Sequence, residues 1–216
     1  MGGSNEVERY LRTCRTDFWK AVFDLEIEYL VRHLAGCRDV LSVGCGPAVI
    51  ESALSERGFR VTGLDVSREA LDRAPDSIRT VAAKAEDMPF PASSFDAVIY
   101  VASLQFIEDY EAAIHRTARV LHPAGRLIVM LLNPASGFFK EKHRDPHSYV
   151  RRIRHTDLDR IENAVAEHFS IETEYFLAIG GDAVSESRDP ARAALYVIRG
   201  TKLSQDSRPR NVSERR

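Results

Sequence analysis

The sequence has few of the features that mark secreted or membrane proteins. It contains three cysteines, Cys14, Cys37 and Cys45, and none belongs to a C-x-x-C pair. We therefore expect free thiols in a reducing compartment rather than a disulfide framework. The apolar runs are short, such as residues 127–132, and cannot span a bilayer. Residues 1–20 lack the apolar core of a secretory signal, and these absences together predict a cytoplasmic protein.

Several ligand-binding patterns are also missing. Lys and Arg number 30 against 32 Asp and Glu, which gives a formal net charge of −2 and no general attraction to nucleic acid. There is no G-x-x-x-x-G-K-[ST] run, so the sequence does not indicate a nucleoside triphosphatase. The cysteines and histidines show no recognised zinc spacing, and we expect no metal site. A hydrophobic content of 44% over 216 residues is sufficient for the core of one α/β domain.

The most informative feature present is a glycine turn between two apolar segments. Residues 40–48 read as a buried strand, a tight turn and the start of a helix, and the next apolar run ends at Asp65. Gly44 and Gly46 carry no side chain that would hold a ligand away from the backbone. A carboxylate in the position of Asp65 can accept hydrogen bonds from both hydroxyls of a ribose. The pattern predicts a site for a nucleoside cofactor.

The details of the turn argue against a dinucleotide. A dinucleotide fingerprint requires a third glycine where this chain has Val49, and a pyrophosphate needs free amide donors at the start of the helix. Pro47 removes one of those donors. A mononucleoside with a cationic or neutral tail therefore fits better than a nicotinamide dinucleotide, although an oxidoreductase is one alternative to test.

Four segments, in order along the chain, resemble the class I S-adenosylmethionine-dependent methyltransferases, in particular the small-molecule type with a methyltransferase domain. They are residues 40–48, residues 61–67, residues 85–90, and the stretch from Phe95 through Leu127. Four ordered matches are far more specific than one glycine turn. The resemblance implies an α/β fold with a Rossmann-like, doubly wound, mostly parallel sheet and an antiparallel C-terminal edge hairpin. It also implies S-adenosyl-L-methionine as the cofactor.

The resemblance further implies which residues contact the cofactor. They come from the glycine turn, the acidic end of the second strand, the loop after the third strand, the end of the fourth strand and an N-terminal aromatic side chain. The expected contacts are Ser42, Gly44, Cys45, Gly46, Asp65, Val66, Glu86, Asp87, Met88, Val101 and Tyr10. Cys45 lies on the ligand turn, and we interpret it as a small filler rather than a nucleophile.

Three positions depart from the residues usual in that family. The family usually has an acidic residue where Ser42 stands, a third glycine where Ala48 stands, and often histidine where Gln105 stands. Alanine is the smallest replacement, so close packing survives. Serine can still bond a cofactor amine, but it lacks the negative charge that favours the methionine ammonium group. We assign no general base at Gln105.

Alternating strands and helices predict one methyltransferase domain over residues 1–203, followed by a flexible tail at 204–216. Within the domain, residues 1–36 are expected to form an N-terminal helical cap, helical over about 5–35 with Ser4 or Asn5 as a possible N-cap. The other expected elements are strands at 39–43, 60–65, 78–82, 95–101, 125–132, 169–179 and 193–199, and helices at 47–57, 67–74, 109–121 and 156–168.

Two regions outside the cofactor half are expected to select the acceptor. One is the N-terminal cap, whose aromatic residues either lie over the cofactor or form ordinary core. The other is a basic insertion at residues 133–155, which follows the end of a sheet strand. We expect it either to form a lid for an anionic acceptor or to be a solvated surface. The candidate substrate contacts are Trp19, Gln105, His143, His147, Tyr149 and Arg151.

The sequence thus predicts an S-adenosylmethionine-dependent methyltransferase that acts on a small molecule, with an anionic acceptor as one prediction. Catalysis is expected to rest mainly on positioning, because the sulfonium already activates the methyl group. No catalytic residue is assigned. The alternative is a regulatory or scaffold protein that binds the same cofactor without methyl transfer.

Overall fold

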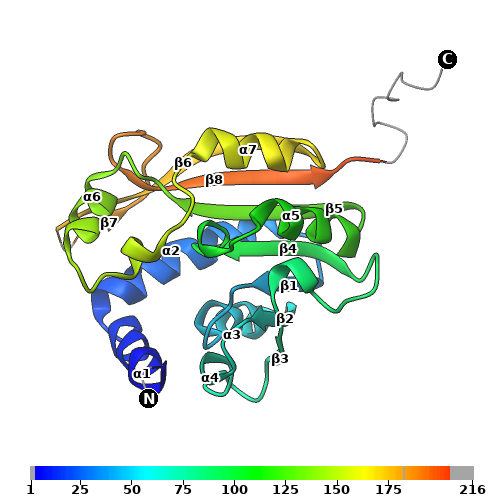
Figure 1. Cartoon of the computed structure of the whole chain (residues 1–216), viewed down its shortest axis with the longest axis horizontal. Helices are drawn as coiled ribbons and strands as arrows, with labels where there is room; N and C mark the ends of the chain where they lie inside the picture. The colour runs from blue at the N-terminus through cyan, green and yellow to red at the C-terminus, as the bar shows by residue number, and fades with distance from the viewer. Residues whose placement is uncertain (1–2, 182, 205–216) are drawn as a thin grey trace.

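A computed structural model describes residues 3–181 and 183–204, and side chains are described from Val7 onward. In this part of the chain the strands form one eight-stranded sheet in the order β3-β2-β1-β4-β5-β8-β6-β7 (Figure 1). Strands β1 to β5 are parallel, whereas β8 pairs antiparallel with both β5 and β6. The strands are β1 Asp39–Val43, β2 Arg60–Asp65, β3 Arg79–Ala82, β4 Phe95–Val101, β5 Leu121–Leu132, β6 Phe169–Gly180, β7 Ala183–Ser185 and β8 Ala193–Lys202. The predicted fold class, including the C-terminal antiparallel hairpin, is confirmed.

The central strands are apolar because both faces of the sheet are covered. Strand β1 is buried from Val40 to Val43, and β4 is buried over most of its length. Strand β5 begins at Leu121, earlier than the predicted residue 125, and its pairing with β4 shifts register between Phe95 and Ala97. The helix before β5 therefore runs directly into the strand, without the loop that the sequence suggested.

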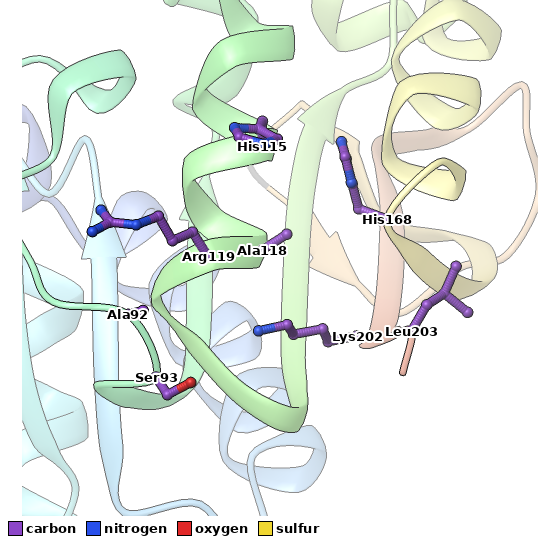
Figure 2. Close-up of a pocket in the computed structure, with 8 residues that line it drawn as sticks. All are labelled: Ala92, Ser93, His115, Ala118, Arg119, His168, Lys202 and Leu203. Carbon is purple, nitrogen blue, oxygen red and sulfur yellow. The ribbon is translucent and has the colours of Figure 1, made fainter. Parts of the chain in front are cut away.

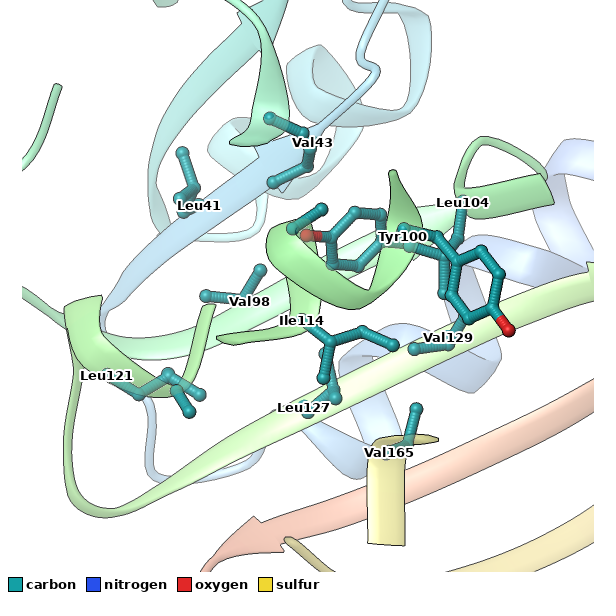
Figure 3. Packing of buried hydrophobic residues seen from close by; sticks show 14 of the residues in the cluster. Leu41, Val43, Val98, Tyr100, Leu104, Ile114, Leu121, Leu127, Val129 and Val165 are labelled. Atoms are coloured by element: carbon teal, nitrogen blue, oxygen red, sulfur yellow. The ribbon is translucent and has the colours of Figure 1, made fainter. Parts of the chain in front are cut away.

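Helices cover the two faces of the sheet. On one face, α5 (Tyr110–Val120) and α7 (Leu158–Ala166) lie over the strands, and Figure 3 shows Ile114 and Val165 meeting Val98 and Val129 of β4 and β5. On the other face lie α2 (Asp17–His33), α3 (Val49–Glu56) and α6 (Gly137–Arg144). The remaining helices are α1 Gly3–Cys14, α4 Arg68–Leu71, η1 Ala85–Asp87, η2 Leu104–Phe106 and η3 Tyr149–Arg152.

The N-terminal region differs from the single helical stretch that was predicted. It forms two helices, and the first begins at Gly3, so the predicted N-cap at Ser4 or Asn5 is wrong. The second helix begins after Thr16, whose hydroxyl accepts a hydrogen bond from the backbone N–H of Trp19 at 3.4 Å. A threonine in this position satisfies a free amide at the start of a helix, which explains the break.

The C-terminal half contains the insertion and the sheet edge. Residues 133–155 form α6 and η3 joined by short turns, and β7 adds a short strand that the sequence did not indicate. Residues 205–216, most of the predicted flexible tail, lie outside the described part of the chain. None of the helices in the described part is long and apolar enough to cross a membrane.

Candidate functional site

The carboxyl ends of β1, β2, β3 and β4 meet at one edge of the sheet, beside the glycine turn. Strand β1 lies between β2 and β4. The strand order reverses at β1, with β2 and β3 on one side of it and β4 and β5 on the other. Open α/β sheets bind ligands in the crevice at such a switch point. The sequence-predicted cofactor residues on these strands and the loops after them are therefore brought to the same edge.

The two glycines of the turn serve different purposes. Gly44 has φ +77°, and a Cβ there would lie 2.5 Å from the Cβ of Ser103, so this position must be bare for the chain to close. Gly46 has φ +54°, and a Cβ there would meet no atom within 4 Å. Of the two, Gly46 has open space in its side-chain direction, whereas Ser103 fills that direction at Gly44.

Asp65 ends β2 and is hydrogen-bonded to the turn. Its Oδ2 accepts from the backbone N–H of Gly46 at 2.8 Å, and its Oδ1 accepts from that of Ser67 at 2.8 Å. Each carboxylate oxygen keeps a second lone pair, so the half-buried group can still accept bonds from a ribose. The next residue, Val66, is 71% exposed. Among the described residues the exposed large apolar side chains are Val66 and Tyr10, both predicted cofactor contacts.

A buried carboxylate missing from the sequence predictions lies under the turn. Glu51, in the first turn of α3, accepts a hydrogen bond from the Ser42 hydroxyl at 2.5 Å, and both residues are buried. Burial raises the pKa of Glu51 to about 7, while the bond from Ser42 opposes that rise. The acidic group that is missing at Ser42 is thus present on a helix nine residues later. A glutamate in the first helical turn after the glycines was the signal available in the sequence.

The loop after β3 presents its acidic residues unequally. The Oε1 of Glu86 faces the backbone N–H of Asp109 at 3.5 Å, and the carbonyl of Glu86 accepts from Arg116 at 3.0 Å. Asp87 is exposed and Met88 is buried. Asp87 is therefore the carboxylate of this loop that is more accessible to a ligand.

Cys45 behaves as the filler that the sequence suggested. A Cβ on Gly63 would lie 2.6 Å from the Cys45 sulfur, so the thiol occupies the space above that glycine. Burial raises the pKa of Cys45, and the charges of Glu51 and Asp65 act in the same direction. A reactive thiolate is disfavoured here.

The N-terminal cap and the insertion contact each other through aromatic side chains. Trp19 of α2 lies edge-on to Phe138 of α6, with ring centroids 6.3 Å apart. Tyr149 of η3 stacks on Phe106 at 6.3 Å. Tyr10 of α1 is 47% exposed.

Several predicted substrate residues are engaged elsewhere. Gln105 is fully buried, and its amide group bonds to the backbone of Leu132 and His155. His143, His147 and Arg151 are exposed, and Arg151 donates to the carbonyl of His143. The described part of the chain contains no group of three or more His, Cys, Asp or Glu that could hold a metal ion.

A separate hollow of about 270 Å³ lies at the opposite edge of the sheet. Figure 2 shows His115 of α5 and His168 facing each other there, with ring centroids 5.6 Å apart. Ser93 precedes β4 and Leu203 follows the antiparallel β8, so this hollow is at the amino ends of the parallel strands. It is not part of the site at the glycine turn.

Comparisons with known proteins agree with this geometry. Residues 41–129 match the family model described as "Methyltransferase domain". A ubiquinone biosynthesis O-methyltransferase from Alkalilimnicola ehrlichii is 31% identical over 157 residues, which cover 63% of this chain and 64% of that protein. These matches support a class I S-adenosylmethionine-dependent methyltransferase. A demethylmenaquinone methyltransferase from Tropheryma whipplei is 34% identical over 96 residues, 42% of this chain and 40% of that protein. The chain thus spans less than two thirds of the length of these two relatives.

Solved structures support the fold of this class I methyltransferase. A methyltransferase from Thermotoga maritima, described as a possible histamine N-methyltransferase, has a TM-score of 0.72 at 21% identity, covering 93% of this chain and 98% of that one. A methyltransferase from Archaeoglobus fulgidus has a TM-score of 0.65 at 15% identity, covering 83% and 94%.

S-adenosylmethionine is the cofactor of this family, and the site fits it. The open face at Gly46 leaves room beside the backbone, and the exposed Val66 offers an apolar surface for the adenine. Asp65 would accept the ribose hydroxyls. The Glu51 carboxylate, bound to Ser42, would face the methionine ammonium.

Replacing Asp65 by alanine is expected to weaken binding of S-adenosylhomocysteine by about 5- to 150-fold, because charge-assisted bonds worth roughly 1–3 kcal/mol are lost. Binding of 5′-methylthioadenosine should weaken equally, since it carries the same ribose. Titration calorimetry measures both, with Asp76→Ala, on the exposed turn before β3, as the matched control. An unchanged dissociation constant in Asp65→Ala would remove the ribose role.

Proposed function

We propose that this chain transfers the methyl group of S-adenosylmethionine to a small-molecule acceptor, and that a hydroxyl group is the first acceptor class to test. The observation that carries the proposal is the pairing of the Glu51 carboxylate with Ser42 beside the open backbone of Gly46 and the Asp65 carboxylate. These groups complement an ammonium group and a ribose at one crevice. When bound, the cofactor supplies a methyl group already activated by a positive sulfur.

The residues of the chain then act by binding and orientation. Asp65 would fix the ribose, Glu51 would fix the amino acid tail, and Asp87 would contact the adenine edge. Effective molarity from such positioning can contribute roughly 7–11 kcal/mol in well-oriented reactions. No covalent enzyme group is required.

Aromatic side chains and the name of one relative both favour a hydroxyl group on a planar molecule as the acceptor. The N-terminal cap and the insertion carry Tyr10, Trp19 and Tyr149, and aromatic side chains of this kind suit a planar organic acceptor. One of the relatives is named an O-methyltransferase. An anionic acceptor gains no support from the insertion, because Lys140, Arg144, Arg151, Arg152 and Arg154 are exposed and the buried charged groups near the crevice are acidic.

The experiment is methyl transfer with radiolabelled S-adenosylmethionine to a panel of phenol, catechol, 4-hydroxybenzoate and histamine. The expected result is transfer to a neutral phenol, together with binding of S-adenosylhomocysteine and no binding of reduced nicotinamide dinucleotides. Transfer only to 4-hydroxybenzoate would restore the anionic acceptor. Cofactor binding with no transfer to any member of the panel would favour the binding-only alternative.

Glu51→Gln provides a test of the tail contact. Glutamine keeps an acceptor for Ser42 but removes the charge, so we expect binding of S-adenosylhomocysteine to weaken by about 5- to 30-fold, within the range for charge-assisted bonds. Binding of 5′-methylthioadenosine, which lacks the amino acid tail, should stay within about twofold. Calorimetry on both ligands separates this result from a general loss of folding. An equal loss for the two ligands would contradict the assignment.

The pH dependence of the same titration provides a second measurement. Burial raises the pKa of Glu51 to about 7. As the pH falls below that value, protonation of Glu51 should weaken the binding of S-adenosylhomocysteine through its amino acid tail. Glu51→Gln should lose this dependence.

A further inference from the structure

A single side chain, Gln105, holds both ends of the insertion. Its Nε2 donates to the carbonyl of Leu132, which precedes the insertion, at 3.1 Å, and to the carbonyl of His155, the last residue of the insertion, at 3.1 Å. Its Oε1 accepts from the backbone N–H of Leu132 at 2.7 Å, and its own carbonyl accepts from the N–H of Arg154 at 3.0 Å. Gln105 is 0% exposed, so bulk water does not compete for these bonds. The path of the insertion therefore starts and ends at one buried residue.

The segment that carries Gln105 also packs against the glycine turn. Ser103, the N-cap of η2, donates its hydroxyl to the carbonyl of Val43 at 2.6 Å and fills the side-chain direction of Gly44. The preceding Ala102 has φ +46°, a conformation that a residue with a side chain seldom adopts. Such backbone strain persists only where the surrounding contacts fix it, and it is concentrated at functional sites. Residues 102–105 thus connect the glycine turn to the insertion.

The C-terminal half of the insertion is fastened to the same part of the chain. Nε2 of His155 lies 2.9 Å from the carbonyl of Ile107, and because a carbonyl only accepts, this nitrogen donates. The His155 ring also lies edge-on to Tyr110, with ring centroids 4.6 Å apart. Phe106 of η2 stacks on Tyr149 of η3, with centroids 6.3 Å apart. A shift of η2 would therefore displace Tyr149 and the end of the insertion with it.

The register of the sheet places the start of the insertion near the glycine turn. Ser42 of β1 is level with Ile99 of β4, and Ile99 is level with Ile128 of β5. Because these three strands are parallel, the glycine turn and Leu132 leave the sheet at the same edge. Two strand spacings, about 10 Å, separate β1 from β5. A cofactor and a small acceptor together can span that distance.

We propose that Gln105 is a positioning residue: it couples occupation of the cofactor site to the placement of the insertion, and thereby sets the affinity for the acceptor. This role rests on the proposed function, and Gln105 acts through the insertion rather than by touching the acceptor. A cofactor at the turn restrains Val43 and Ser103, and the bonds of Gln105 pass this restraint to Leu132 and His155. Coupling is reciprocal, so a bound acceptor should tighten cofactor binding by the same factor.

Hydrogen–deuterium exchange, followed by mass spectrometry on the full chain, tests the coupling without an acceptor. The proteins are the wild type, Gln105→Met, Ser103→Ala and Thr117→Val, each with and without saturating S-adenosylhomocysteine. Gln105→Met keeps the length of the side chain but removes its hydrogen bonds, and Ser103→Ala breaks the connection at its other end. Thr117→Val is the matched control, because it removes an equally buried bond, 2.7 Å to the Tyr100 hydroxyl, on the face covered by α5.

In the wild type, we expect S-adenosylhomocysteine to slow amide exchange in α6 and η3 by about 5-fold or more, the lower end of the usual range for coupled sites. Gln105→Met and Ser103→Ala should still bind the ligand and show slowed exchange at the glycine turn. In these two variants the effect on α6 and η3 should fall below about twofold. Thr117→Val should behave as the wild type. If Gln105→Met does not fold, Ser103→Ala decides the result.

Kinetics provide the second measurement, with the member of the acceptor panel that the wild type methylates fastest. Gln105→Met should raise the KM of the acceptor by about 5-fold or more and leave the KM of S-adenosylmethionine within about twofold. An equal rise in both constants would show that Gln105 only supports the fold.

Two results of the exchange experiment would overturn the proposal: no slowing in the insertion of the wild type, or the same slowing in Gln105→Met and Ser103→Ala. Both would leave the proposed function intact. A wild type that shows the coupling but methylates no member of the panel would overturn the acceptor role of Gln105. Failure to bind S-adenosylhomocysteine would overturn the proposed function as well.

Discussion

Gly44→Ala is expected to lower the free energy of unfolding by about 2 to 5 kcal/mol. Two causes act together: the new Cβ would lie 2.5 Å from the Cβ of Ser103, and φ +77° is strained for any residue with a side chain. Ser103 cannot retreat freely, because its hydroxyl donates to the carbonyl of Val43 at 2.6 Å. Urea denaturation followed by circular dichroism measures the loss.

Gly46→Ala is the matched comparison. It has a similar backbone strain at φ +54°, but its Cβ meets no atom within 4 Å, so we expect a stability loss of only about 1 kcal/mol. Its effect should instead fall on cofactor affinity, because the methyl group enters the space at the turn. If Gly44→Ala folds normally, or if Gly46→Ala binds S-adenosylhomocysteine as the wild type does, the division of roles between the two glycines is wrong.

Stability is expected to fall as the pH rises from about 5 to 9. Burial raises the pKa of Glu26 from 4.5 to about 8, so the folded chain keeps a proton that the unfolded chain releases. The stability that this group contributes is complete below pH 4.5 and is lost as the pH approaches 8. For Glu26 alone the change is about 3 to 5 kcal/mol. Glu51, with its pKa raised to about 7, acts in the same direction.

Thermal melts across this pH range test the prediction. Glu26→Gln removes the titrating group, so its melting temperature should exceed that of the wild type by an amount that grows toward pH 9. Glu28→Gln should follow the wild-type curve. A constant difference between Glu26→Gln and the wild type at all pH values would show that Glu26 does not titrate in this range.

The sequence was sufficient for the sheet and the glycine turn because their signals are local. Strands β1, β2 and β4 have the predicted bounds, since an apolar run flanked by turn residues fixes a buried strand. Asp65 could be placed at the end of β2 from its position alone. Helix starts were less certain: α3 begins at Val49 rather than residue 47, because Ala48 adopts a left-handed conformation at its N-cap.

The groups that the sequence analysis missed depend on contacts between distant elements. Glu26 is one of several acidic residues on α2, and only the packing of that helix separates it from the exposed Glu28. The partners of Gln105 were equally hidden from the sequence, in which its position suggested an acceptor contact. Its amide instead joins the ends of β5 and the insertion through bonds to Leu132 and His155. No periodic pattern reveals which partner a polar side chain finds across the fold.

The hydrogen bond between Ser42 and Glu51 bears on how relatives of this chain can be recognised. A pattern search that demands an acid at the end of the first strand would pass over any homologue in which a serine there is hydrogen-bonded to a glutamate of the neighbouring helix. Scoring the strand serine and the helical glutamate as one two-position unit would recover such homologues.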